Sequence, residues 1–352
     1  MKKLLTLLLP VLALGCTSTP PAKEAKESTK AAMGGELHVL NWAEYFADST
    51  IPNFEKECGC KVIYDNFESG EALRAKLDHV PSGYDVVFPS DEVVPPLVAG
   101  GKLEALDPTK LPNFKNISKT FRGMSYDPEN RFTVPYMWGL TGIGYDKKKI
   151  KPTPDSWAVM LDPKKGKLMT LLDDPRETFT AALRLEGAKD LTSVTPEQIA
   201  KAKKRIAAVK PKAWNSQPQS MLIQGDVVLA QMFNGDAAQV AAEGIDFGFV
   251  IPKEGGTIWF DNMAIAKGSK QVALAHRFID YLMRPEVAAA NTNFKKYPNP
   301  NEAAKPFIEP AILNNPMIYP PESEIARCHV LGDVAPEVRK QIMDAWAEIK
   351  AE

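Results

Sequence analysis

Hydrophobic and polar positions follow two alternating periods over the first third of the chain. Short apolar runs rich in β-branched and aromatic residues are each followed by a stretch in which apolar residues recur at helical spacing. The expected strands lie at 36–42, 60–67 and 84–90, and the expected helices at about 48–57, 69–80 and 91–100. Strands separated by helices pair in parallel through crossovers, so this pattern predicts an α/β domain.

The middle of the chain repeats the pattern after an irregular, proline-rich stretch at about 107–135. An extended segment, PYMWGLTGIGYDKKKI (135–150), leads into a helix from Pro175 and a strand, VVLAQMF (227–233). A second extended segment, GGTIWFDNMAIAKG, covers residues 255–268. Further helices are expected at 195–210, 270–292 and 335–350. Because the chain crosses between the two blocks twice, we expect two discontinuous α/β lobes joined by two crossing strands.

Side chains suited to ligand binding follow two of the expected strands. In α/β sheets, ligands bind outside the carboxyl ends of the strands. Trp42, Glu44 and Tyr45 of the NWAEYF stretch fall at such a position, and so does Ser90 of YDVVFPS. The alternative is that the two rings are ordinary core residues and that Glu44 is solvated.

Length and charge narrow the classes of function. A chain of 352 residues suits two domains of ordinary size or one large domain. The 43 Lys and Arg are balanced by 44 Asp and Glu, which gives a net charge of −1. A nucleic-acid surface needs a clustered basic face, so we expect no nucleic-acid partner.

The first residues, MKKLLTLLLPVLALGC, have the features of a secretory leader, with two lysines before a short apolar stretch. Ala13-Leu14-Gly15-Cys16 resembles a bacterial lipobox, although Ala13 stands where leucine is usual. We therefore expect a signal peptide at 1–15, an acylated Cys16, a flexible tether at 16–35 and a membrane-anchored protein in the periplasm or at the cell surface. The alternative is an ordinary leader that is cleaved after Gly15. No later segment is expected to cross a membrane.

The remaining cysteines, Cys58, Cys60 and Cys328, do not form an evident site. The Cys58-Gly-Cys60 spacing is tight for a disulfide, and we expect no zinc site from these cysteines and His329. We expect structural or idle thiols, and we leave a bridge to Cys328 open. No P-loop, HExxH or GxSxG motif is present, so we expect no enzyme, no metal and no cofactor.

From about residue 36 to the C-terminus, the chain resembles the polyamine-binding (spermidine/putrescine) periplasmic proteins of ABC importers. The matching stretches occur in order: NWAEY, NFEKECGCKVIYDNFES, YDVVFPS, VPYMWGLTGIGYD, LLDDPRETF, FNGD, IPKEGGTIWFDNMAI, YLMRPEVA and NNPMIYPP. The resemblance implies the two-lobed type II solute-binding fold, a monomer, a ligand held between the lobes and an inner-membrane ABC permease as partner. The lobes would be 36–138 with 259–307, and 139–258 with 308–352.

A polyamine needs carboxylates at its ends and apolar walls along its methylenes. An ammonium loses several kcal/mol of hydration unless acceptors replace the water, and aromatic faces attract the cationic ends. In a strand, alternate side chains share a face, so Trp259 and Asp261 can point together. The resemblance implies that Asp261 binds an ammonium and that Trp259 stacks along the chain. The alternative is a core ring beside a surface aspartate.

The other implied ligand residues have structural alternatives. Asp174 and Glu177 match acidic ligand positions, but Asp174-Pro175 is also a regular helix start of the capping-box kind. Asp236 is matched by aspartate in the putrescine-selective branch, which favours putrescine, yet it has the position of a helix N-cap. The remaining matches are Trp42, Glu44, Tyr45, Ser90, Phe233, which replaces the usual tryptophan, and Tyr297.

Glu92 departs from the family pattern, because the spermidine branch has tyrosine there. This extra carboxylate either binds a further ammonium or lies outside the site. Two other functions keep the same pocket: a polyamine-sensing subunit of a membrane receptor, and a binding protein for another small cationic solute. Amino-acid or anion ligands would call for an arginine, and only Arg176 stands among the matched positions.

Overall fold

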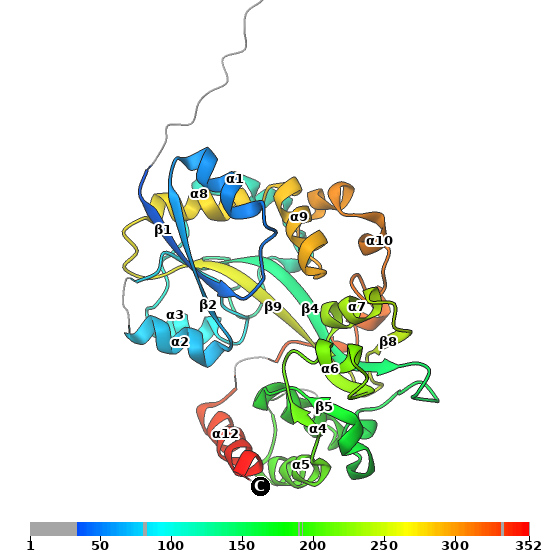
Figure 1. Ribbon diagram of the computed structural model, residues 1–352. Helices are drawn as coiled ribbons and strands as arrows, with labels where there is room; N and C mark the ends of the chain where they lie inside the picture. Colours follow the sequence, from blue (N-terminus) through cyan, green and yellow to red (C-terminus); the bar gives the residue numbers. More distant parts are fainter. Residues whose placement is uncertain (1–33, 80–82, 189–190, 192, 332–333, 352) are drawn as a thin grey trace, which may run out of the picture. The chain divides into compact units, whose positions relative to one another are not determined.

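The computed structural model describes residues 34–79, 83–188, 191, 193–331 and 334–351 (Figure 1). The expected leader, Cys16 and nearly all of the expected tether lie outside these residues. The described chain forms an α/β fold around one sheet with strand order β2-β1-β3-β9-β4-β7-β5-β6, to which β10 and β8 add through β9 and β4. The strands are β1 (Glu36–Trp42), β2 (Lys61–Phe67), β3 (Val86–Val87), β4 (Thr133–Asp146), β5 (Met169–Leu171), β6 (Ala213–Trp214), β7 (Leu229–Phe233), β8 (Phe247–Val250), β9 (Gly256–Ile265) and β10 (Cys328–His329).

Helices alternate with these strands in both halves of the chain. Parallel pairing is confirmed where it was expected: β1 pairs in parallel with β2 and β3, and β5 pairs in parallel with β6 and β7. The α-helices are α1 (Thr50–Cys58), α2 (Gly70–His79), α3 (Val94–Ala99), α4 (Pro175–Leu185), α5 (Pro196–Val209), α6 (Gln219–Ile223), α7 (Asn234–Ala242), α8 (Val272–Leu282), α9 (Pro285–Lys295), α10 (Pro310–Leu313), α11 (Glu322–Ile325) and α12 (Pro336–Ala351).

The irregular stretch before β4 contains 3₁₀ turns instead of regular elements. Prolines begin two of these turns, because their fixed φ suits a first helical position while the missing N–H prevents a longer ladder. The 3₁₀ helices of the described residues are η1 (Pro108–Lys110), η2 (Pro112–Asn116), η3 (Lys119–Phe121), η4 (Trp157–Val159), η5 (Pro163–Leu168) and η6 (Glu302–Phe307).

The two extended segments cross between the halves of the fold, as predicted. The first part of β4, from Thr133 to Thr141, lies antiparallel to β9, and β9 in turn borders β3. From Thr141 onward β4 pairs instead with β7 and β8. The fold is thus two-lobed, and each lobe is assembled from separate stretches of the chain.

Apolar residues on opposite faces of the strands form separate cores. Along β1, Val39 packs into a cluster with Phe54 of α1 and Phe278 of α8, whereas Leu40 packs into a cluster with Leu73 of α2. Figure 1 accordingly shows α1 and α8 over one face of this part of the sheet, and α2 and α3 over the other. A third core lies in the other half, around α4, α5 and α12.

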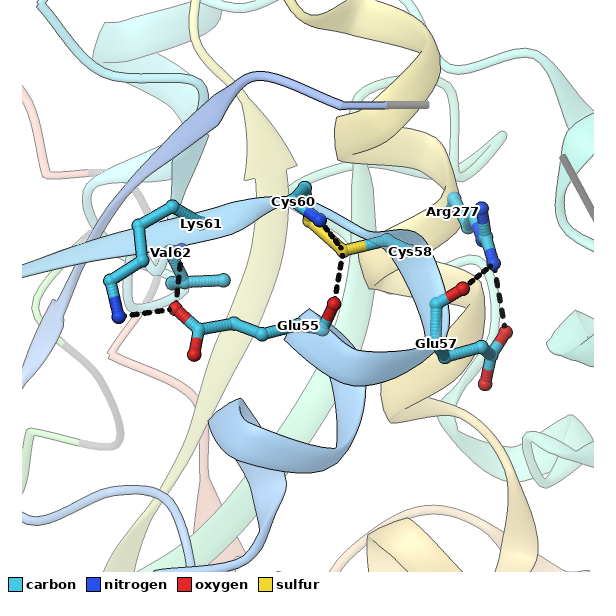
Figure 2. Close-up of a disulfide and its surroundings, with 7 residues drawn as sticks. All are labelled: Glu55, Glu57, Cys58, Cys60, Lys61, Val62 and Arg277. Carbon is cyan, nitrogen blue, oxygen red and sulfur yellow. Dashed lines mark hydrogen bonds and ion pairs between the residues drawn. A yellow bond between two sulfur atoms is a disulfide. The ribbon is translucent and has the colours of Figure 1, made fainter. Parts of the chain in front are cut away.

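Cys58 and Cys60 form a disulfide, so the prediction of free thiols at these positions is wrong (Figure 2). Gly59 ends α1 in the left-handed conformation (φ 64°, ψ 34°), which glycine adopts without a Cβ clash. The resulting turn brings the two Cα atoms to 5.2 Å, inside the range that a disulfide requires. Cys328 is a buried free cysteine, so the bridge that was left open is not formed.

The disulfide lies between two ionic contacts that hold α1 in place. Glu55 accepts hydrogen bonds from the Val62 N–H and the Lys61 ammonium at the start of β2. Glu57 accepts from Arg277 of α8, drawn in Figure 2, and forms an ion pair with Arg284 after α8. The Arg284 guanidinium also donates hydrogen bonds to the Glu57 carboxylate, and these bonds lower the pKa of Glu57 to about 2.

Within the described residues, no helix is both long enough and apolar enough to cross a bilayer. The same part of the chain has no group of three or more His, Cys, Asp or Glu side chains placed to hold a metal ion.

Candidate ligand-binding site

Asp261 and Tyr45, two predicted site residues that lie far apart in the sequence, are joined by a hydrogen bond. Tyr45 follows β1, and its buried hydroxyl donates a 2.5 Å hydrogen bond to the carboxylate of Asp261 on β9. Tyr136 of β4 fixes the backbone there, since its hydroxyl donates to the Tyr45 carbonyl at 2.8 Å. Burial raises the pKa of Asp261 to about 7, because the charged carboxylate is desolvated.

Asp236 and Tyr297 form a second tyrosine–carboxylate pair. Asp236 lies in the first turn of α7, and its carboxylate accepts a 2.8 Å hydrogen bond from the Tyr297 hydroxyl. Phe233 is the N-cap residue of α7, so the alternative that Asp236 is only an N-cap is wrong. Both partners are buried, and burial raises the pKa of Asp236 to about 6.

Aromatic rings connect the two pairs. Trp259, two residues before Asp261 on β9, packs edge-on against Phe233 (5.5 Å) and Tyr297 (5.2 Å between ring centroids). The Tyr45 and Tyr297 rings are 6.2 Å apart. Phe233, Trp259 and the two tyrosines therefore form one aromatic cluster that includes the hydrogen-bond partners of both carboxylates.

Two glycines allow this close packing. A Cβ on Gly139 of β4 would lie 2.3 Å from the Trp259 ring, and one on Gly235 of α7 would lie 2.0 Å from the Tyr297 ring. Both distances are far inside van der Waals contact. Any side chain at Gly139 or Gly235 would push the rings that flank the carboxylates, or the backbone behind them.

Glu177 is a buried carboxyl from the other half of the fold. Asp174 caps α4, accepting from the N–H groups of Arg176 (2.8 Å) and Glu177 (3.1 Å), so the predicted helix start is confirmed. The reciprocal capping-box bond is not among the hydrogen bonds of the described residues. Instead, Glu177 accepts a 2.9 Å hydrogen bond from the Thr141 hydroxyl of β4.

The environments of these two acids raise their pKa values. Burial, reinforced by the charge of Asp174, raises the pKa of Glu177 to about 8. Asp174 is only half-buried by exposed area, yet desolvation still raises its pKa to about 6. Arg176 is the cation close enough to oppose that rise.

Ser90 lies beside Asp261 in an isolated bridge between their backbones. Its hydroxyl donates a 2.7 Å hydrogen bond to Glu92, whose charge contributes to the raised pKa values of Asp174, Glu177 and Asp261. The bond to Ser90 holds the Glu92 carboxylate next to the segment that borders Asp261. Asp91 instead accepts from the Phe260 N–H at 2.9 Å, and burial raises its pKa well above the usual value.

The structure does not bring every predicted residue into this arrangement. Glu44 is exposed, has a left-handed backbone (φ 53°) and takes part in none of the hydrogen bonds or ion pairs found among the described residues. Trp42 packs against Phe67 and is near enough to Asp261 for its indole N–H to lower the pKa of that carboxyl, although no full hydrogen bond forms.

Several residues that contribute to the site were missed by the sequence analysis. Most are small or hydroxyl residues of β4, β9 and α7 whose role depends on cross-strand distance, for which a single sequence carries no signal. The alternation along β9 could have indicated Thr257, which lies on the same face as Trp259 and Asp261. The missed residues are Thr141, Thr257, Tyr136, Asp91, Gly139, Gly235 and Lys295, whose ammonium lies over the Tyr45 and Tyr297 rings.

The side chains on one face of β9 form a row that suits an elongated cation. Thr257, Trp259 and Asp261 alternate along one face of β9, with Glu177 near the first and Tyr45 bonded to the last. The backbone positions of Thr257 and Asp261 are about 14 Å apart at about 3.4 Å per residue. Desolvated carboxyls thus flank an indole ring, which is an arrangement for binding a positively charged solute.

The two-lobed fold and a ligand site built from buried side chains define the class of solute-binding proteins. The family model for bacterial extracellular solute-binding proteins matches residues 50–318, and the chain belongs to this family.

Named relatives cover most of the chain. The putrescine-binding periplasmic protein of Pseudomonas aeruginosa (strain UCBPP-PA14) is 34% identical over 92% of this chain and 94% of its own. The spermidine/putrescine-binding periplasmic protein of Salmonella typhimurium is 36% identical over 85% and 87%. The structure of the spermidine/putrescine ABC transporter substrate-binding protein from Streptococcus pneumoniae superimposes with a TM-score of 0.78 at 27% identity, covering 90% and 99%.

Proposed function

We propose that this protein captures polyamines outside the cytoplasm and delivers them to an ABC importer. The observation that carries the proposal is the group of desolvated carboxyls, Glu177, Asp236 and Asp261, arranged around Trp259 and two tyrosine rings. Buried anions without full compensation are costly. An alkyl diammonium relieves that cost at its ends while its methylenes contact the rings, at about 0.8 kcal/mol per buried CH2.

The proposed ligand residues come from both halves of the chain. We propose that the lobes are 36–138 with 259–307, and 139–258 with 308–352, and that ligand is held between them by a monomer. Glu44 remains in the set as a residue that would approach a bound ligand. The proposed ligand residues are Trp42, Glu44, Tyr45, Ser90, Asp174, Glu177, Phe233, Asp236, Trp259, Asp261 and Tyr297.

Calorimetric titration of residues 33–352 with putrescine, cadaverine, spermidine and spermine tests the proposal. We expect saturable binding of at least putrescine, with one ligand per chain. Glutamate and γ-aminobutyrate are matched controls, since each carries a carboxylate that the acidic site should repel. Tight binding of either control, or no heat with any polyamine, would refute the proposed ligand class.

We also propose that Cys16 is acylated and provides the membrane attachment. A diacylglyceryl group with an amide-linked chain holds more firmly than a single acyl chain. Replacing Cys16 by serine should move the protein from the membrane fraction to the soluble fraction when cells are fractionated and blotted. A Cys328→Ser variant controls for loss of a cysteine. A Cys16→Ser protein that stays wholly in the membrane fraction would mean a different anchor.

A further inference from the structure

Lys295 places an ammonium group beside the two tyrosines of the site. It is the last residue of α9, and its Nζ lies 5.6 Å from the centroid of the Tyr45 ring and 5.4 Å from that of Tyr297. Both distances are within the range of a cation–π contact. The Lys295 carbonyl accepts a hydrogen bond from Gln239 of α7, which ties the end of α9 to the helix that carries Asp236.

The same two tyrosines donate their hydroxyl groups to Asp261 and Asp236. The charge of Lys295 reaches both carboxyls, because it opposes the burial that raises their pKa values. The Lys295 ammonium makes no ion pair or side-chain hydrogen bond with another described residue. Its principal electrostatic partners in this part of the chain are therefore the rings and acids of the candidate site.

A lysine side chain has four methylenes and a terminal ammonium, which is the chemistry of one end of a diaminoalkane. We infer that Lys295 acts as a tethered ammonium that competes with the ligand for the Tyr45–Asp261 and Tyr297–Asp236 pairs. The inference rests on the proposed function, since it concerns cationic ligands of the same site.

The Lys295 charge is expected to stabilise the ligand-free protein and to weaken the binding of a polyamine. In the ligand-free protein the cation offsets part of the repulsion among buried carboxylates. When a polyamine enters, the same charge repels the ligand ammonium or must move aside. Affinity for every polyamine is then lower than the carboxylates alone would give, and a ligand with more ammonium groups meets more repulsion.

Titration of charge variants with putrescine and spermidine tests this role. Lys295→Gln removes the charge while keeping a polar chain, and we expect it to bind putrescine about tenfold more tightly, with at least as large a gain for spermidine. Lys295→Arg keeps the charge and should stay closer to the parent than to Lys295→Gln. Lys305→Gln is the matched control, because Lys305 is an exposed lysine that forms an ion pair with Glu302.

Unchanged or weaker binding by Lys295→Gln, in a protein that melts as the parent does, would overturn the inference while leaving the proposed function intact. An equal gain in Lys305→Gln would overturn it as well, because the effect would then belong to net charge. A parent protein that binds neither polyamine would instead refute the proposed function, and the competitor role with it.

Discussion

Replacing Asp261 by asparagine is expected to lower putrescine affinity about 30-fold or more. Asparagine keeps the shape of the side chain and can still accept from the Tyr45 hydroxyl, but it carries no charge for an ammonium. Removing one partner of a desolvated charge pair costs about 2 to 5 kcal/mol, and each 1.4 kcal/mol is tenfold in affinity. Calorimetric titration with putrescine measures the loss directly.

A second buried aspartate provides the control for this variant. Asp280 of α8 is 8% exposed, close to the 5% of Asp261, and bonds to Asn113 instead of a site residue. Asp280→Asn should change thermal stability but not putrescine affinity. If a folded Asp261→Asn protein bound putrescine as the parent does, the ammonium would be held elsewhere and the assignment of Asp261 would be wrong.

Putrescine affinity is expected to rise steeply between pH 5 and pH 8. The ligand ammonium, with a pKa near that of lysine at about 10.4, stays charged throughout. Asp261, whose pKa is raised to about 7, must be ionised to pair with it. Protonation of a single carboxyl with this pKa weakens putrescine binding about 100-fold from pH 8 to pH 5. Protonation of Glu177 and Asp236 makes the pH dependence of affinity steeper.

The stability of the ligand-free protein should have the opposite dependence. A carboxyl whose pKa is raised on folding binds more protons in the native state, between its unfolded pKa near 4 and its folded value. Its contribution to the free energy of unfolding is therefore most favourable at low pH. That contribution is lost as the pH rises to about 7 for Asp261 and to about 8 for Glu177. Groups such as Glu57, with a pKa of about 2, lose their contribution only below about pH 4.5.

Titrations and thermal melts at pH 5, 6, 7 and 8 test both expectations together. The melting temperature without ligand should fall from pH 5 to pH 8, while the increase caused by putrescine should grow. In Asp261→Asn the pH dependence of affinity should be shallower. Affinity that does not change over this range would mean that the site carboxyls are already ionised at pH 5.

The element order was predictable because the hydrophobic periods are clear. Val39 and Leu40 are neighbours in β1 and pack into different hydrophobic cores, one on each face of the sheet. A strand that is buried on both faces has a continuous apolar pattern, which is easy to recognise in the sequence. The two extended segments stood out by length, and they became β4 and β9. Their pairing with each other depends on contacts between distant positions, which no local pattern specifies.

The site was partly predictable, because residue types suggest ligand chemistry but distances decide which side chains meet. Trp259 and Asp261 could be paired from strand alternation alone. That Tyr297 would bond to Asp236 depends on how α7 meets the segment after α9, and that Glu177 would bond to Thr141 depends on how α4 meets β4. The disulfide was missed because its formation depends on the left-handed turn at Gly59 and not on the number of residues between the cysteines.

The position of β9 between β3 and β4 also has a consequence for synthesis and truncation. Asp91, just after β3, bonds to Phe260, which comes 169 residues later in the chain. Until that later stretch is present, β3 and the first part of β4 have unpaired backbone edges that can recruit other strands. A gene product that ends before residue 256 would therefore be an aggregation-prone fragment and not a smaller working protein, and full-length chains should fold slowly, as long-range pairing requires.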